Sequence, residues 1–592
     1  MDERKKDILA AGIVFIFLLA VIINNYIWLK IDYSPFTYDA HRQFMFSLRV
    51  FKEYQNLSLR TFSDIIKMTQ RHPPLTAMVT APLYFLFGIA QDTGTMANSA
   101  IFITILLFSV YGIAKKLKGR KAGILSVFIC GFYPIIFNHM KTYTLDLPVT
   151  AMASLGILFL LLSENLTRTA YSLLFGLSCG LGFLTKDNFP FYVIAPFITS
   201  VVQGIKVGGA KDRNETWAKN ALSWLRRSAV SLFIFSFTAV LISMYYLSKK
   251  HNLVFGKLSF GEYFTFYSPP GDLPDVPLYL LALFKRIKSL LWYVWGFINW
   301  QVSFFFFIIF IISVIYFIRL KFKGKAILLS SLFGFILIAF TKGAYADHMT
   351  WMGVRFTMPV LPYVAIISAI GILSIKTSIF RRVAVFLIIV AGTIQSAVIS
   401  YGSPLLPEEV VIPFQKKMQY SVSRYCLFPE EIILFKQLWP AYGGPLSRPN
   451  IELPGKIRIP EEIFETIDSL NHEHHPINIL VIPDVSRIWA CLEYNSFVKN
   501  RPYQILGDWK YFLEGHNQFS RTMAPNERAN TEQIVLESDY IIDKEAGELG
   551  ENYLLNYVRA LDSVFKRHRD KFSLIKEFVW PDNSEVSIYR KD

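Results

Sequence analysis

The sequence predicts an α-helical protein that crosses a membrane many times and ends in an α/β domain. Of the 592 residues, 53% are hydrophobic and only 18% are charged, and this apolar share is larger than soluble domains usually have. The apolar residues are gathered into runs long enough to cross roughly 30 Å of hydrocarbon. Residues 402–592 differ, because their charges are frequent and their apolar runs are short. We therefore expect a membrane domain at 1–401 and a separate domain at 402–592.

We expect about eleven transmembrane helices from the apolar runs. The predicted spans are residues 8–29, 97–114, 122–140, 147–163, 170–185, 189–205, 228–248, 302–320, 326–341, 357–376 and 380–401. The first run follows a short charged segment and could be mistaken for a signal peptide. It has no small-residue cleavage site and further spans follow it, so we expect it to be retained as an anchor.

The Lys and Arg residues of the connections predict how the chain is oriented. They form five clusters: Arg4–Lys6, Lys115–Lys121, Lys206–Arg227, Lys321–Lys325 and Arg381–Arg382. With eleven spans, all five clusters fall on one side, which the positive-inside rule makes the cytoplasmic side. This agreement requires that the apolar run at 75–91 does not cross the membrane. We expect a helix there that lies in, or dips into, the outer surface.

The remaining connections then lie outside the cytoplasm. They are residues 30–96, which form the first outer loop, together with 141–146, 186–188, 249–301, 342–356 and everything after 402. The net charge of +16 is placed partly in the inner connections. No basic stripe interleaved with aromatic residues occurs in the soluble part, so we expect no nucleic-acid binding.

The pattern of residues 402–592 predicts both strands and helices. Short apolar runs favour strands at 477–483, 533–536 and 539–543, and a hairpin formed by 572–580 and 586–589 around a polar turn. Helices are expected at 461–470 and 553–567. No glycine-rich phosphate-binding motif is present. This length of chain is sufficient for one α/β domain.

Two carboxylates are candidates for chemistry at the outer surface, Asp39 in the first outer loop and Asp146 just before a span. A carboxylate is costly near hydrocarbon and is rarely kept there without a role. Asp39 could take a proton from an attacking hydroxyl or amine, or hold a divalent cation. Both residues could instead cap a helix, and Pro148 in the first turn after Asp146 fits that alternative.

Several basic residues are placed at the same surface. Arg71 and His72 precede Pro73-Pro74, which imposes an extended corner and directs the side chain before it. Lys186 and Arg355 each stand at the outer end of a predicted span. These four side chains could bind a phosphate group. The alternative is that they are surface charges, or that the long side chains only reach from the helix ends into water.

Taken in this order, the motifs resemble the membrane glycosyltransferases of the GT-C fold. The resemblance is to the branch that uses polyprenyl-phosphate sugars, which includes the protein mannosyltransferases and the lipid A aminoarabinose transferase. It covers essentially the whole chain, least securely residues 402–570. The matching pieces are Asp39, His72-Pro-Pro-Leu75, Thr144-Leu-Asp-Leu-Pro148, Gly182-Phe-Leu-Thr-Lys186, Arg355-Phe-Thr-Met-Pro-Val-Leu-Pro362 and the hairpin after Phe578.

The resemblance implies an inverting sugar transfer from a polyprenyl-phosphate donor to a protein, lipid or glycan acceptor. The enzyme would span the inner or plasma membrane among its lipids, with the active site and the C-terminal domain outside the cytoplasm. Asp39 would orient or deprotonate the acceptor, and Asp146 would hold the acceptor or a cation. Arg71, His72, Lys186 and Arg355 would support the charge of the phosphate.

One departure from the family concerns metal binding. Such enzymes often have a second acidic residue directly after the first Asp, and here Ala40 and His41 follow Asp39. A divalent cation remains the one cofactor to consider, with Asp39, His41 and Asp146 as candidate ligands. Two other classes stay open: a lipid or polysaccharide transporter or flippase, and a polysaccharide polymerase or ligase. Transporters often show paired halves and broken helices at the midplane, which this sequence does not indicate.

Overall fold

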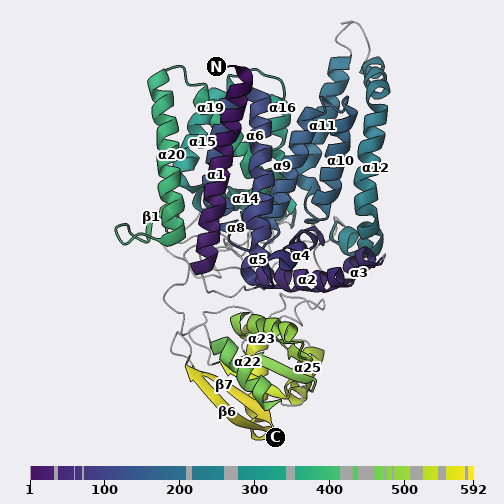
Figure 1. Cartoon of the computed structure of the whole chain (residues 1–592), viewed down its shortest axis with the longest axis vertical. Helices are drawn as coiled ribbons and strands as arrows, with labels where there is room; N and C mark the ends of the chain where they lie inside the picture. The colour runs from purple at the N-terminus through teal and green to yellow at the C-terminus, as the bar shows by residue number, and fades with distance from the viewer. Residues whose placement is uncertain are drawn as a thin grey trace. The chain divides into compact units, whose positions relative to one another are not determined.

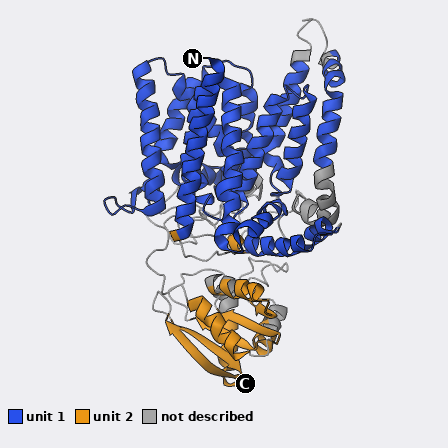
Figure 2. Ribbon diagram, in the orientation of Figure 1, with its two compact units in different colours: residues 1–30, 42–449 blue, residues 31–41, 450–592 orange. Residues whose placement is uncertain are grey.

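The chain forms two compact units. The first contains residues 1–30 and 42–449, and the second contains residues 31–41 and 450–592 (Figure 2). The computed structural model describes residues 2–31, 38–58, 60–69, 73–208, 217–258, 278–341, 354–413, 431–437, 459–471, 475–482, 486–506, 525–544, 555–579 and 585–592.

The first unit is a bundle of apolar helices (Figure 1). They are α1 (Glu3–Ile31), α6 (Ile103–Lys118), α7 (Arg120–Phe132), α9 (Asp146–Leu162), α10 (Thr169–Phe183), α11 (Pro190–Gly208), α12 (Trp217–Leu258), α14 (Leu278–Gly296), α15 (Ser303–Ile318), α16 (Lys325–Ser330), α17 (Phe333–Thr341), α19 (Leu361–Leu373) and α20 (Ser378–Tyr401). Among the described residues, five helices are long and apolar enough to cross a membrane, and several shorter apolar helices accompany them. The chain is therefore a multi-pass membrane protein, as predicted.

Some predicted spans are divided or begin elsewhere. The run at 122–140 consists of α7 and α8 (Pro134–His139), because Pro134 has no N–H to continue the helix. The run at 326–341 consists of α16 and α17. Residues 249–301 were expected in an outer connection, but α14 within them packs against α17. That expectation was wrong for α14, because the polar residues Asn299 and Gln301 interrupt the apolar run and hide its continuation into α15.

The basic clusters Arg4–Lys6 and Lys115–Lys121 lie together at the end of the bundle that carries the N-terminus (Figure 1). Lys115 Nζ and Arg120 Nη1 lie 3.0 and 3.1 Å from the Asp7 carboxylate, and Arg120 also pairs with Glu3. Lys116 pairs with Glu164 in the connection between α9 and α10. These contacts join the start of α1, the turn between α6 and α7, and the connection between α9 and α10, which the sequence analysis predicted to lie on the same side. That this side faces the cytoplasm stays a prediction.

Short helices lie across the other end of the bundle (Figure 1). They are α2 (Tyr38–Gln55), α3 (Thr61–Met68), α4 (Leu75–Phe87) and α5 (Gln91–Met96). With 13 residues, α4 is about 20 Å long, too short to cross the hydrocarbon alone. It packs against α2, where Ser47 Oγ and Tyr84 Oη are 2.7 Å apart. This agrees with a helix at 75–91 that does not cross.

The second unit contains a mixed five-stranded sheet in the order β4-β3-β5-β7-β6. Its strands are β3 (Ile477–Ile482), β4 (Tyr503–Leu506), β5 (Tyr540–Lys544), β6 (Phe572–Val579) and β7 (Glu585–Lys591). The first three are parallel, and β7 pairs antiparallel with both β5 and β6. Alternate residues of β3 and β5 point to two apolar clusters, one on each face of the sheet. The predicted strands at 477–483 and 539–543 and the hairpin are confirmed.

The helices of this unit are α22 (Ile459–Leu470), α23 (Ser486–Val498), α25 (Pro525–Glu537) and α26 (Leu555–Arg567). The predictions of α22 and α26 are confirmed, whereas α23 and β4 were not predicted. The strand expected at 533–536 was wrong, since these residues end α25. A run of four residues has too little periodicity to separate a helix from a strand, and Ile534 and Val535 are buried beside α26.

A small antiparallel ribbon belongs to the first unit. It consists of β1 (Glu409–Pro413) and β2 (Glu431–Lys436). Asn299 connects it to the bundle, because its side chain donates to Glu431 O at 3.0 Å and accepts from Ile433 N at 3.1 Å. The structure thus groups residues 402–449 with the helices, and the compact second unit resumes at Asn450.

Candidate functional site

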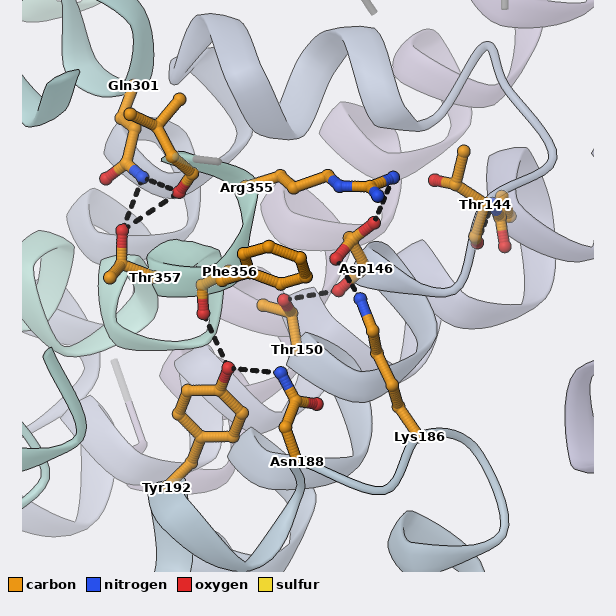
Figure 3. Close-up of polar contacts among 12 residues, drawn as sticks. Thr144, Asp146, Thr150, Lys186, Asn188, Tyr192, Gln301, Arg355, Phe356 and Thr357 are labelled. Carbon is orange, nitrogen blue, oxygen red and sulfur yellow. Dashed lines mark hydrogen bonds and ion pairs between the residues drawn. The ribbon is translucent and has the colours of Figure 1, made fainter. Parts of the chain in front are cut away.

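Three residues that the sequence analysis singled out meet in the first unit. Asp146 begins α9 and is only 2% exposed. Its Oδ1 atom lies 2.6 Å from Lys186 Nζ, and its Oδ2 atom lies 3.5 Å from Arg355 Nη1 (Figure 3). Because the N-terminus of a helix favours negative charge, α9 also supports the carboxylate. The two cations and one carboxylate leave a net charge of +1 in a buried place.

Lys186 stands in the short connection between α10 and α11. Its backbone N–H bonds to Gly182 O at 3.3 Å, so the connection turns tightly after the helix. A Cβ atom on Gly182 would lie 2.2 Å from the ring of Phe189, and therefore only glycine fits there. This close approach explains the glycine of the Gly182-Phe-Leu-Thr-Lys186 motif, which delivers the ammonium group to Asp146.

Arg355 begins the short 3₁₀ helix η4 (Arg355–Val360), and its neighbour Phe356 completes the site. Lys186 Nζ lies 4.9 Å from the centre of the Phe356 ring, and Arg355 Cζ lies 5.3 Å from it. Both distances are in the range of cation–π attraction. Tyr192 Oη donates to Phe356 O at 2.5 Å, and Asn188 Nδ2 donates to Tyr192 Oη at 3.0 Å. The α10–α11 connection and the start of η4 are thereby joined.

The two contacts of Asp146 differ in strength. The Lys186 contact has the length of a strong charge-assisted hydrogen bond, whereas the Arg355 contact is longer than the usual 2.7–2.9 Å. Asp146 Oδ2 is buried and accepts no hydrogen bond within the part of the chain that the structure describes. Arg355 is thus held beside the carboxylate without a close bond to Oδ2. Lys186 and Arg355 could therefore both attract an anion that bound beside Asp146.

The Pro-Pro corner ends beside the same residues. Leu75 N, at the start of α4, donates to Leu184 O at 2.9 Å in the connection that carries Lys186. Farther along α4, Thr80 Oγ1 bonds to Tyr143 Oη at 2.8 Å, three residues before Asp146. The helix therefore touches the segments of two site residues. Arg71 and His72 lie outside the described residues, and their role in phosphate binding stays a prediction.

Asp39 and His41 belong to the second unit. Asp39 is half-buried in the first turn of α2, and its role as a base stays a prediction. His41 Nε2 lies 2.9 Å from Glu493 Oε2, and its side chain is buried. Within the described ranges, no group of three or more His, Cys, Asp or Glu side chains is arranged to hold a metal. The neighbours that the structure gives Asp146 are cations, and these would repel a metal ion.

The comparisons with known proteins bear on the fold. Residues 71–242 match the family model described as dolichyl-phosphate-mannose-protein mannosyltransferase. Over 98% of both chains, the structure is similar to that of ArnT from Cupriavidus metallidurans bound to undecaprenyl phosphate, with a TM-score of 0.52 and 13% identity. The apo form of that protein matches over the same shares with a TM-score of 0.50 and 13% identity.

A more distant match is the archaeal oligosaccharyltransferase AglB from Archaeoglobus fulgidus. It has a TM-score of 0.40 and 12% identity over 96% of this chain and 74% of that one. No curated protein sequence matches the chain. The resemblance that the motifs indicated is nevertheless confirmed for the fold, and the chain has the GT-C fold.

Proposed function

We propose that this protein transfers a sugar, with inversion, from a polyprenyl-phosphate donor to an acceptor at the outer face of the inner or plasma membrane. The observation that carries the proposal is the pair of buried cations, Lys186 and Arg355, which one carboxylate holds together. Buried charges of this kind are costly in a membrane protein and usually serve function. A fold similar to that of a protein bound to undecaprenyl phosphate supports the same donor class.

The proposed reaction is one displacement at the anomeric carbon. A hydroxyl or amine of the acceptor attacks that carbon from the face opposite the phosphate, and its proton passes to Asp39. The bond between the anomeric carbon and the phosphate oxygen breaks, and its electron pair stays on that oxygen. The phosphate changes from a diester with one negative charge to a monoester with two. The sugar leaves with its configuration inverted.

Lys186 and Arg355 support the charge that develops on the phosphate. Fixed cations in a dry site favour the more highly charged transition state over the donor. Asp146 acts through them, because it holds both near one point before the donor arrives. That Asp146 holds the acceptor or a divalent cation stays a prediction. Arg71 and His72, at the Pro-Pro corner, would supply further positive charge.

Residues 450–592 have a different task in this proposal, although Asp39, the proposed base, is grouped with the same unit. We assign to the α/β fold of residues 450–592 the selection of the protein, lipid or glycan acceptor. Membrane lipids surround the first unit, and the prenyl chain of the donor would lie among its helices. A resident metal is not required for the displacement as written, since the cations of the protein meet the phosphate.

The test uses the purified protein in a lipid bilayer with a panel of radiolabelled polyprenyl-phosphate sugars. Release of free lipid phosphate, together with labelled acceptor, supports the proposal. The matched control is Lys116→Met, which removes an exposed lysine at the other end of the bundle. A protein that moves intact donor across the bilayer without cleaving it would be a transporter, and the proposal would then be wrong.

A further inference from the structure

Two π-helical turns contact the segments that carry Asp146 and Arg355. Each turn contains a buried side-chain amide that donates hydrogen bonds to one of these segments. The turn η1 (Ala97–Phe102) leads directly into α6, and η2 (Phe297–Val302) leads directly into α15. Such turns are rare and occur frequently at functional sites. Asn98 in the first and Gln301 in the second are fully buried. Sequence reasoning missed both. The one signal that the sequence offered was an amide side chain in or next to an apolar run.

Asn98 holds the segment that ends in Asp146. Its Nδ2 atom donates to Thr142 O at 2.7 Å and to Thr144 O at 2.9 Å. A side-chain amide carries two hydrogens, and both are used here. Residues 141–146 are all buried, so no water replaces these bonds. Two backbone carbonyls within four residues of Asp146 thus bond to one side chain from another helix.

Gln301 holds the segment that carries Arg355 in the same way. Its Nε2 atom donates to Val354 O and, at 2.6 Å, to Thr357 Oγ1 (Figure 3). These two acceptors flank Arg355 in the chain. The turn that supplies Gln301 ends at Ser303, whose φ of +66° is unusual for a residue other than glycine. Such strain persists only where the surroundings impose it.

We propose that Asn98 and Gln301 are positioning residues that set the 3.5 Å contact between Asp146 and Arg355. Asn98 fixes the segment that ends in Asp146, and Gln301 fixes the segment that carries Arg355. Together they set the distance between the Asp146 carboxylate and the Arg355 guanidinium group. At this separation Arg355 stays near Asp146 without the short bond that Lys186 makes, so its positive charge is held in advance at the place proposed for the phosphate. The inference rests on the proposed function. In this proposal neither amide contacts the substrate.

The first test measures the binding of polyprenyl phosphate to the full chain in nanodiscs, and the turnover number with the best donor. Asn98→Ala and Gln301→Ala should each weaken binding about 10-fold and lower kcat about 10- to 100-fold. Ser99→Ala and Ser289→Ala are the matched controls. Ser99 lies in η1 and Ser289 lies in α14, which leads directly into η2, and each hydroxyl donates to a backbone carbonyl outside the site, Thr95 O and Ala339 O. The controls should stay within about twofold of wild type.

The second test separates positioning from general stability. In the Arg355→Met background, Gln301→Ala should cause no further loss of phosphate binding, whereas Asn98→Ala should still cause one. If Gln301→Ala acted only through general stability, its loss of binding would be the same in both backgrounds, and that result would overturn the proposal. Asn98→Ala still lowers binding without Arg355, because its bonds also place the segment that sets Asp146 against Lys186. Asn98→Leu and Gln301→Met keep side-chain bulk while removing the donors, and they replace the alanine variants if those fail to fold.

The two proposals fail differently. If wild-type protein binds polyprenyl phosphate but transfers no sugar, the proposed function is wrong. The binding measurements of the amide variants, with and without Arg355→Met, still test the positioning role. If sugar is transferred and the amide variants keep wild-type binding and kcat, the positioning role is wrong and the proposed function stands. If the amide variants lose only thermal stability, the amides are structural.

Discussion

Asp146 and Lys186 form a buried ion pair with a separation of 2.6 Å, although they are 40 residues apart in the chain. Removing one partner of a buried pair leaves an uncompensated charge and usually costs about 3–5 kcal/mol. A variant of Lys186 alone therefore changes both the binding of a phosphate and the stability of the bundle. An informative experiment has to separate these two effects.

We predict that Lys186→Met and Arg355→Met lower kcat more than they weaken donor binding. Each cation supports a charge that grows in the transition state, and removing one such donor typically costs about 10²–10³ in kcat. Steady-state kinetics and direct donor binding give the two quantities. The control for Lys186 is the double variant Lys186→Met with Asp146→Asn, which has no unpaired carboxylate. If that double variant turns over like wild type, Lys186 does not support the phosphate.

Asp39→Asn should abolish transfer while the protein still folds and inserts. Asparagine keeps the size of the side chain and can cap a helix, but it cannot take a proton, and loss of a general base usually costs about 10²–10⁴ in rate. Turnover is measured beside the thermal unfolding of the same preparation. Asp64→Asn is a suitable control, since Asp64 forms an exposed pair within α3. Near-normal turnover of Asp39→Asn would remove Asp39 as base or metal ligand.

His72 should act as a cation at the Pro-Pro corner, so His72→Ala should lower transfer more at low pH than at high pH. An ordinary imidazole is charged below about pH 6.5 and neutral above it. The wild-type advantage over the variant should thus grow as the pH falls through that region. The measurement is the ratio of wild-type to variant kcat between pH 5.5 and pH 8. A ratio that does not change with pH would contradict the imidazolium role.

The orientation of the bundle is tested with reporters that are active only outside the cytoplasm. A fusion after Tyr401 should be active and a fusion at Lys118 should be silent, because α20 ends at the opposite end from the basic clusters. The reverse pattern would invert the topology and move Asp146, Lys186 and Arg355 to the cytoplasmic side. The proposed outer-face reaction would then be wrong, although the geometry of the cluster would be unaffected.

Much of the site was predicted from the sequence. The Lys and Arg residues of the connections assign each end of a predicted span to one side of the membrane, and residues at ends on the same side lie at one surface. Asp146, Lys186 and Arg355 each stand at such an end, and the structure brings them into contact. Phe356, Asn98 and Gln301 were not predicted, since their roles depend on side-chain contacts between helices. The strand expected at 533–536 was wrong for a similar reason, because burial beside α26 decides the form of a short apolar run.

The last prediction concerns the second unit, where Asp468 bonds to Arg501 at 2.7 and 3.0 Å and accepts from Tyr503 at 2.6 Å. Burial raises the pKa of Asp468, but the hydrogen bonds from Arg501 and Tyr503 outweigh it, so its pKa in the folded state is below the ordinary value. A carboxyl group with a lowered pKa stabilises the fold above its ordinary pKa of about 3.9, and this contribution is lost as the pH falls through the folded pKa.

We expect residues 450–592 expressed alone to be soluble, folded and without transferase activity. Asp468→Asn should lower the Tm of this fragment at pH 7 by roughly 5 °C and should flatten the fall of Tm below pH 4, because the titrating group is gone. Asp562→Asn is the control, since Asp562 forms an exposed pair with Lys566 and such pairs contribute little. Equal Tm values for wild type and Asp468→Asn across this pH range would show that the Asp468 cluster does not stabilise the unit. Transfer by the fragment, which lacks Asp39, Asp146, Lys186 and Arg355, would show that these residues do not carry the reaction.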